Sequence, residues 1–325
     1  MTPRWIFALA LIPLLSGCAR RSAVSPVGER QRQIERLQEF SREKGFPETG
    51  NFKRTDLKKA AYFLCYYAKK WELPEDYDDL GYREGNAKGC GLDEKKFDIY
   101  FHRVEAVAFE DTPVTASLAD ASDERALMVA AHEEVHEDPN LERLPHAIGE
   151  AASTLLGMLT AAEFARREGD VETATHLSED ARIFEKKARA VNQLHADLTS
   201  LYAAHHAGKR SREETSAEKD RLFREAGRAC AGFGTARSIN PCLPAANNAG
   251  LAFDHTYTRM YPMLYALYES AGSNLDGFLV ELRELGESGK RDLASMESLI
   301  RDRVVRNASE NSRPRTLGVG GASVP

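Results

Sequence analysis

Apolar residues recur with helical spacing over most of the chain, and strand-like clusters gather in one region only. Between residues 59 and 118, aromatic and β-branched residues predict strands at 60–67, 97–101 and 104–109, with a further candidate at 112–118. Elsewhere apolar residues three and four positions apart predict helices. These helices are expected at residues 29–44, 122–136, 147–167, 248–270, 275–287 and 290–305. The pattern favours a predominantly helical α+β fold with a small N-terminal sheet.

The longest periodic stretch, residues 172–228, predicts a helical hairpin. An apolar stripe runs through its first half from Leu177 to Leu201, which is typical of a helix with one buried face. The segment 205–209 contains a glycine and can form a turn, so two antiparallel helices joined by a short loop are expected.

The start of the chain has the pattern of a bacterial lipoprotein signal. Arg4 precedes an apolar run, residues 5–15, that is too short to cross a bilayer as a helix. Leu-Ser-Gly-Cys follows and looks like a lipobox in which Cys18 receives the lipid. Residues 1–17 are therefore expected to be a signal peptide, and residues 18–28 a tether.

Acyl chains on Cys18 are expected to hold the mature protein in a lipid bilayer. The predicted location is the bacterial cell envelope, and Ala19 after the cysteine is compatible with an outer-membrane protein that faces the periplasm. One large domain is expected over residues 29–310. The tail at 311–325 is rich in Gly, Ser and Pro and is expected to be disordered.

Charge and cysteine content narrow the function classes. The 325-residue chain has a formal net charge of −6, and its basic residues are interleaved with acids, which argues against a nucleic-acid partner. Besides the lipobox cysteine there are four others, an even number that favours two disulfides in an oxidising compartment. Three connectivities are possible. The working hypothesis pairs nearest neighbours, Cys65 with Cys90 and Cys230 with Cys242.

The stretch His-Glu-Glu-Val-His at residues 132–136 has the spacing of a metallopeptidase motif. His132 and His136 are four residues apart, so they share one face of a helix and can bind one metal ion. Glu133 is rotated by about 100° from the first histidine, which places it beside the metal. There it can accept a proton from zinc-activated water as general base. The predicted cofactor is Zn²⁺, and the predicted substrate is a peptide or protein.

A catalytic zinc site also needs a third protein ligand and an open position. Glu150 is the preferred third ligand because it lies within a second helical pattern. Pro139 and Pro145 interrupt the chain before it, so this helix can fold back against the first. His146 is the alternative ligand.

Peptide hydrolysis further needs a hydrogen-bond donor for the oxyanion. The segment 247–262 is dense in possible donors, and Tyr257 and His255 are the candidates. The run 112–118, just before the motif, is a candidate edge strand that pairs with an extended peptide substrate.

In their order along the chain, these features resemble a bacterial family of lipoproteins predicted to be zinc aminopeptidases, of a gluzincin-like HExxH type. The lipobox, the motif at 132–136, the helix with Glu150 and the Asn-Asn-Ala segment at 247–249 follow one another as in that family. The stretches 261–267 and 275–278 look like its C-terminal signature. The resemblance covers most of the mature chain.

The resemblance implies a zincin-like fold and a membrane-anchored, zinc-dependent aminopeptidase. It also implies that the general base is Glu133 and that the zinc ligands are His132, His136 and Glu150. The chain departs from the family at two positions, Gly149, where Asn is common, and Glu134, where a neutral residue is usual. The alternative function is a non-catalytic metal-binding or scaffold lipoprotein of the cell envelope.

Overall fold

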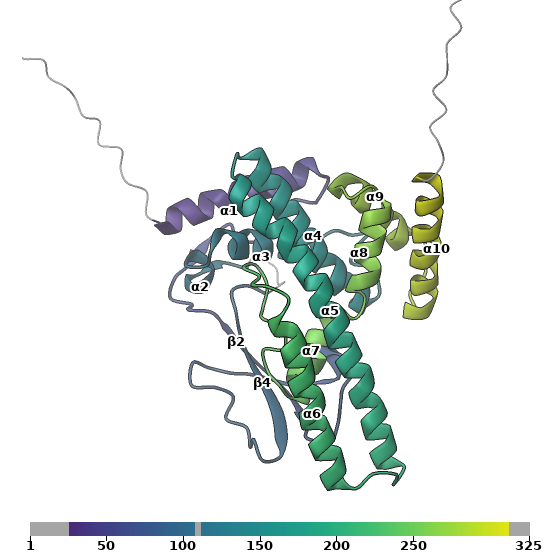
Figure 1. Cartoon of the computed structure of the whole chain (residues 1–325). Coiled ribbons are helices and arrows are strands. Elements are labelled where there is room, and N and C mark those ends of the chain that lie inside the picture. The colour runs from purple at the N-terminus through teal and green to yellow at the C-terminus, as the bar shows by residue number, and fades with distance from the viewer. Residues whose placement is uncertain (1–25, 108–111, 312–325) are drawn as a thin grey trace, which may run out of the picture.

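In the computed structural model, which describes residues 26–107 and 112–311, a small sheet lies beside a larger body of helices (Figure 1). The predominantly helical character predicted from the sequence is confirmed. None of the helices in the described ranges is long and apolar enough to cross a membrane. The predicted signal peptide, the proposed lipidation site Cys18, most of the predicted tether and nearly all of the predicted tail lie outside the described residues.

The sheet has three antiparallel strands in the order β3-β2-β4. The central strand β2 (Tyr62–Lys69) pairs with β3 (Gly81–Glu84) and β4 (Phe97–Val104). Strand β3 was not predicted, because it is short and has no apolar alternation. The register places Leu64 opposite both Glu84 and His102. Since side chains alternate across a sheet, these three share one face.

The two other strand predictions near this sheet were largely wrong. Strand β4 ends at Val104, so residues 105–107 form no strand, and the last two residues of that prediction, 108 and 109, lie outside the described residues. In the run 112–118 only β5 (Val114–Thr115) is a strand, and it pairs in parallel with β1 (Thr55–Asp56). The helix α2 (Ala116–Ala119) follows at once, because the Thr115 hydroxyl accepts the Leu118 N–H and caps it.

The predicted helices are present with small shifts at their ends, and the hairpin is made by two of them, α5 and α6. The single helix expected at 248–270 is divided, because Pro262 fits only the first turn of a helix. The helices are α1 (Pro26–Glu43), α3 (Asp123–Val135), α4 (His146–Arg167), α5 (Val171–His206), α6 (Arg212–Ala231), α7 (Asn248–Thr258), α8 (Tyr261–Ser270), α9 (Leu275–Glu287) and α10 (Leu293–Asn311). In Figure 1 the sheet lies to one side of the hairpin, and α8 to α10 lie to the other.

Close packing between α3 and α4 sets the geometry of the helical body. Nearly all of α4 is buried, and Gly157 lies where α3 crosses it. A Cβ atom at this glycine would lie 3.0 Å from the Met128 carbonyl oxygen and 3.2 Å from His132 Cβ. Because no side chain intervenes, α3 approaches α4 closely enough for residues of both helices to meet.

The cysteines pair as nearest neighbours, so the hypothesis drawn from the sequence is confirmed. Cys65 in β2 is joined to Cys90, which ties the segment after β3 to the sheet. Cys230 at the end of α6 is joined to Cys242. The second disulfide holds the loop that leads from the hairpin into α7.

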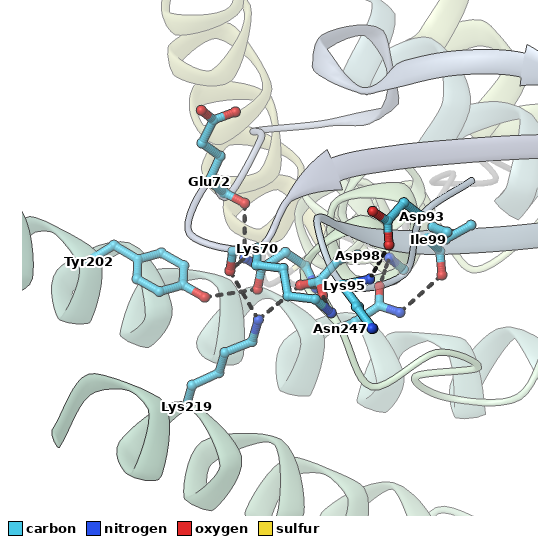
Figure 2. Close-up of polar contacts among 11 residues, drawn as sticks. Lys70, Glu72, Asp93, Lys95, Asp98, Ile99, Tyr202, Lys219 and Asn247 are labelled. Carbon is cyan, nitrogen blue, oxygen red and sulfur yellow. Dashed lines mark hydrogen bonds and ion pairs between the residues drawn. The ribbon is translucent and has the colours of Figure 1, made fainter. Parts of the chain in front are cut away.

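A buried carboxylate anchors α6 and α7 to the sheet (Figure 2). Asp98 in β4 accepts hydrogen bonds from Lys219 Nζ of α6 at 2.9 Å and from Lys70 Nζ at 3.1 Å. It also accepts the backbone N–H of Asn248 at 3.1 Å. Burial alone raises the pKa of Asp98, but the Lys219 charge and these hydrogen bonds hold it below its usual value. The carboxylate therefore stays ionised and fixes three segments together.

The Asn-Asn pair of the family resemblance has a structural explanation here. Asn247 caps α7, because its Oδ1 accepts the Gly250 N–H at 3.0 Å, and its Nδ2 donates to the Ile99 carbonyl at 3.0 Å. The Asn248 side chain accepts the Tyr202 hydroxyl of α5 at 3.0 Å. Together they fix the start of α7 between the sheet and the hairpin.

Candidate metal centre

Helix α3 presents the motif histidines on one face, as their spacing predicted. His132 lies in its last turn and His136 is its C-terminal cap, and their Nε2 atoms are 3.1 Å apart. The same face lines a cleft of about 930 Å³ between the helices and the sheet. The cleft-lining residues of α3 and its cap are Arg125, Met128, Val129, His132, Glu133 and His136.

Glu150 in the first part of α4 completes a compact group of three. Its Oε2 lies 3.7 Å from the Nε2 atom of each motif histidine. Ligand atoms bound at ~2.0–2.1 Å to a tetrahedral ion are about 3.3 Å apart, so this triangle has the size of a metal site. Glu150 Oε2 is also buried and has no hydrogen-bond partner within the described ranges. A metal ion at this position would give the unpaired oxygen a partner.

The pKa shifts of His132 and Glu150 also favour binding of a metal cation. Burial, with the nearby His136, lowers the pKa of His132 to about 3, so its imidazole is neutral and can donate a lone pair. For Glu150, burial raises the pKa, but the hydrogen bond from His146 and the nearby motif histidines outweigh it and hold the pKa at about 2. The neutral His132 imidazole and the ionised Glu150 carboxylate are donors that a divalent ion can bind.

Glu133 lies beside this group and lines the same cleft. Its Oε2 is buried and accepts no hydrogen bond from the part of the chain that the structure describes. Burial and the neighbouring charge of Glu150 raise the pKa of Glu133 to about 8. A carboxylate that is buried, unpaired and close to a possible metal position can exchange a proton with a water molecule or substrate.

His146, the alternative third ligand, lies outside the group of three. Its Nε2 is 3.6 Å from the second Glu150 oxygen, Oε1, and 2.8 Å from the Tyr77 hydroxyl. Tyr77 donates to that same Oε1 at 3.1 Å, and His146 Nδ1 contacts Asp78 at 3.1 Å. These residues orient Glu150 so that its other oxygen, Oε2, faces the histidines.

Tyr77 was not singled out from the sequence. It belongs to η1 (Tyr77–Asp79), a single turn between β2 and β3, and its N–H donates to the Thr256 hydroxyl of α7 at 2.9 Å. The aromatic cluster around residues 62–67 was interpreted as a strand, and no spacing links Tyr77 to the motif. Only folding brings η1 against the start of α4.

Of the two candidate oxyanion donors, one lines the cleft and the other does not. Tyr257 in α7 lines the cleft, and its ring centroid is 6.3 Å from that of His132. His255 does not appear among the described residues of the cleft wall. Its Nδ1 is 2.7 Å from the Glu75 carbonyl oxygen, and its ring stacks on His195 at 3.8 Å between centroids. The structure therefore places His255 behind the segment that carries Tyr77.

The predicted substrate strand also lies elsewhere. No residue of the run 112–118 is among the described residues of the cleft wall, and Val114 and Thr115 are fully buried. The sheet face that does line the cleft is aromatic and is contributed mainly by β2 and β3. It includes Tyr62, Leu64, Tyr66, Tyr82 and Glu84.

The two departures from the family pattern have local explanations. Glu134 points away from the centre, where its Oε1 accepts the Thr49 hydroxyl at 2.6 Å and Gln38 Nε2 of α1 at 2.9 Å. A Cβ added at Gly149 would meet nothing within 4 Å, so the glycine is not required by packing. Neither departure changes the group formed by His132, His136 and Glu150.

Comparisons with known proteins agree with this geometry at the level of a family. A family model described as "Putative aminopeptidase" matches residues 82–295, which is well over half of the chain and includes the three residues that could hold a metal ion. Searches of curated proteins and of solved structures found no match.

Proposed function

This chain belongs to the aminopeptidase family whose model it matches, and on that premise we propose that it is a zinc-dependent peptidase. The proposed ligands are His132, His136 and Glu150, and the proposed general base is Glu133. The observation that carries the proposal is the buried, unpaired Glu150 Oε2, which lies at equal distances from two imidazole nitrogens. Zinc is favoured among divalent ions because two imidazoles and one carboxylate are a frequent ligand set of catalytic zinc.

When bound here, zinc supplies Lewis-acid chemistry that polarises a peptide carbonyl and acidifies water. The residues of the chain perform the other steps. Glu133 accepts a proton from the attacking water and delivers it to the leaving amine. Tyr257, which lines the cleft beside His132, donates to the developing oxyanion. Tyr77 and His146 keep Glu150 in place, and the aromatic wall of the cleft excludes water from the peptide.

We also propose that the protein acts at a membrane surface. The lipobox pattern supports this, because acyl chains on Cys18 would anchor the mature chain through a short tether that ends close to α1. The proposed location is the bacterial cell envelope, and the proposed substrate is a peptide or protein outside the cytoplasm.

The decisive experiment separates metal binding from turnover. Metal content and peptide hydrolysis are measured on the chain from Ala19 onward and on its Glu133→Gln variant. Because glutamine keeps the size of the side chain but cannot accept the proton, zinc should remain bound while turnover falls by ~100-fold or more. Glu137→Gln, an exposed position one turn further on, is the matched control and should leave turnover unchanged.

Two outcomes favour other functions. A protein that binds one zinc ion and hydrolyses no member of a broad peptide library is a non-catalytic metal-binding lipoprotein. A protein that binds no metal leaves only the scaffold alternative.

A further inference from the structure

A second polar cluster lines the same cleft between α5 and α7. Lys187 of α5 and Asp254 of α7 form an ion pair, with Nζ 2.9 Å from Oδ1, and both side chains are almost completely buried. Lys187 Nζ also contacts the carbonyl oxygens of Pro241 at 3.3 Å and Asn240 at 3.5 Å. The ammonium group therefore has an acceptor for each of its three hydrogens.

Arg125, the neighbouring cation in the cleft wall, is also paired with oxygens of the protein. Arg125 Nη2 pairs with Glu105 Oε2 at 2.8 Å, and Nη1 donates to the Ser238 carbonyl at 2.8 Å. Both cations at this end of the cleft are thus already bound to oxygens of the protein. They do not offer a free site for an anionic ligand.

Asp254, in contrast, retains a free acceptor. Its Oδ2 is buried and has no hydrogen-bond partner among the residues described. Burial raises the pKa of Asp254, while the charge and hydrogen bond of Lys187 and a backbone hydrogen bond from Leu243 oppose that shift. Oδ2 itself still has no donor with hydrogen-bond geometry in the described residues. In the described ranges, the buried carboxylate oxygens without partners are Glu133 Oε2, Glu150 Oε2 and Asp254 Oδ2, and all belong to this cleft.

The metal centre and general base account for the first two oxygens and leave Asp254 unexplained. A buried carboxylate oxygen without a donor is costly, so a ligand that brings a donor should bind there.

The charge of the cleft indicates which donor fits. The described residues of its wall include six carboxylates against three cations, which are Lys59, Arg125 and Lys187. The carboxylates are Asp78, Glu84, Glu105, Glu133, Glu150 and Asp254. Because carboxylates outnumber cations in the described wall, a cationic donor is favoured over an anionic group.

The position of Asp254 suits a short peptide. It lies one helical turn before Tyr257 on the same face of α7, so their Cβ atoms are about 5–6 Å apart. Tyr257 has its ring centroid 6.3 Å from that of His132, so Asp254 lines the same cleft beside a residue that neighbours the candidate metal centre.

We propose that Asp254 Oδ2 accepts a hydrogen bond from the free α-ammonium group of the substrate, while Lys187 holds the carboxylate in place. The inference rests on the proposed peptidase function and specifies its substrate class as peptides with a free N-terminus. It assigns the amine-binding acid that removal of N-terminal residues requires and that no sequence motif indicates.

The test compares binding of two tetra-alanine amides, one with a free N-terminus and one N-acetylated, by calorimetry. The parent protein is the zinc-loaded Glu133→Gln variant of the chain from Ala19 onward, in which turnover is suppressed. The free peptide should bind about 10- to 100-fold more tightly, because acetylation removes a charged hydrogen bond. Asp254→Asn in this parent should abolish the difference.

Two further variants make the result specific. Glu84→Gln removes the same charge from an exposed position of the same cleft and should preserve the difference. Asp254→Asn alone leaves Lys187 buried without its partner and can impair folding. The double variant Lys187→Met/Asp254→Asn removes both charges and should also bind the two peptides equally.

Equal affinities in the parent, failure of both peptides to bind, or a preference that survives Asp254→Asn would overturn the inference. The ammonium contact does not involve the metal, so the titration is repeated after chelation and should show the same preference. Failure of the proposed function is visible separately, as a chain that binds no zinc or as a zinc-loaded wild type without turnover.

Discussion

At the scale of single residues, the centre depends on side chains that touch Glu150 as much as on the motif. Glu150 uses one oxygen toward the histidines and the other toward Tyr77 and His146. A carboxylate held in this way loses less freedom when it binds a metal. Gly157 has no side chain, so α3 can approach α4, the helix that carries Glu150, closely.

The proposed ligand set predicts graded losses of zinc affinity. His132→Ala and Glu150→Ala remove a ligand and should abolish tight binding, because two remaining protein ligands seldom hold zinc. His146→Ala removes only an orienting contact and should weaken binding by about 10-fold. Competition with a chromogenic chelator measures the zinc affinity of each of these three variants. Tyr257→Phe is the control and should leave affinity unchanged. Complete metal loss in His146→Ala with retention in Glu150→Ala would reverse the assignment.

At the scale of elements, α7 connects the metal centre to the rest of the fold. Its N-terminus is held by Asn247, Asn248 and Asp98, and its other end carries Asp254 and Tyr257 into the cleft. The anchoring network of Figure 2 therefore determines where the cleft wall lies. The disulfide between Cys230 and Cys242 restrains the loop that enters this helix.

Asp98→Asn should destabilise the protein by about 2–3 kcal/mol, because Lys219 and Lys70 lose a buried partner. The pKa of Asp98 is lower in the folded state than its unfolded value of about 3.9. Its stabilising effect is therefore complete above about pH 5 and is lost as the pH falls through the folded pKa. Urea unfolding at pH 7 and below pH 4 should show a smaller difference between variant and wild type at the lower pH.

Asp93→Asn provides the matched control for that measurement. Asp93 lies on the segment just before β4 and is exposed. Its side chain accepts the local N–H of Lys95 at 3.0 Å and forms an exposed ion pair with Lys96 at 3.9 Å. Its replacement should change stability by less than about 0.5 kcal/mol at either pH. A similar loss in both variants would show that the Asp98 network is not what holds α6 and α7.

At the scale of the whole molecule, α1 is the first described element, and the sheet lies beside the helical body (Figure 1). Residues of both line the cleft. Helix α1 is tied to α3, which carries the motif, through Gln38, which donates to Glu134. The proposed anchor would therefore attach to an element that packs directly behind the motif. A membrane-tethered protein of this form can act on peptides close to the bilayer.

The anchor is tested by Cys18→Ser in full-length protein. Without the thiol no lipid can be attached, so the variant should accumulate as an unprocessed precursor or leave the membrane fraction. Metabolic labelling with a fatty acid, followed by fractionation and immunoblotting, measures both effects. A Cys18→Ser protein that is still processed and still membrane-bound would contradict the proposal.

Several features were determined by the sequence alone, because each depends on residues close together in the chain. The motif histidines share a helix face through their four-residue spacing, and capping residues and prolines set most helix ends. The predominance of helix follows from apolar periodicity. Nearest-neighbour disulfides could be proposed because short loops are easily closed.

Other features were decided only by tertiary structure, because they join segments far apart in the chain. Tyr77 meets Glu150 across 73 positions, and Lys187 meets Asp254 across 67. His255 appeared to be a donor from its neighbours in the chain, but packing against His195 turns it away from the cleft. Local spacing specifies which face of a helix a residue occupies, whereas the partner of that face is selected by burial and hydrogen bonding in the folded chain.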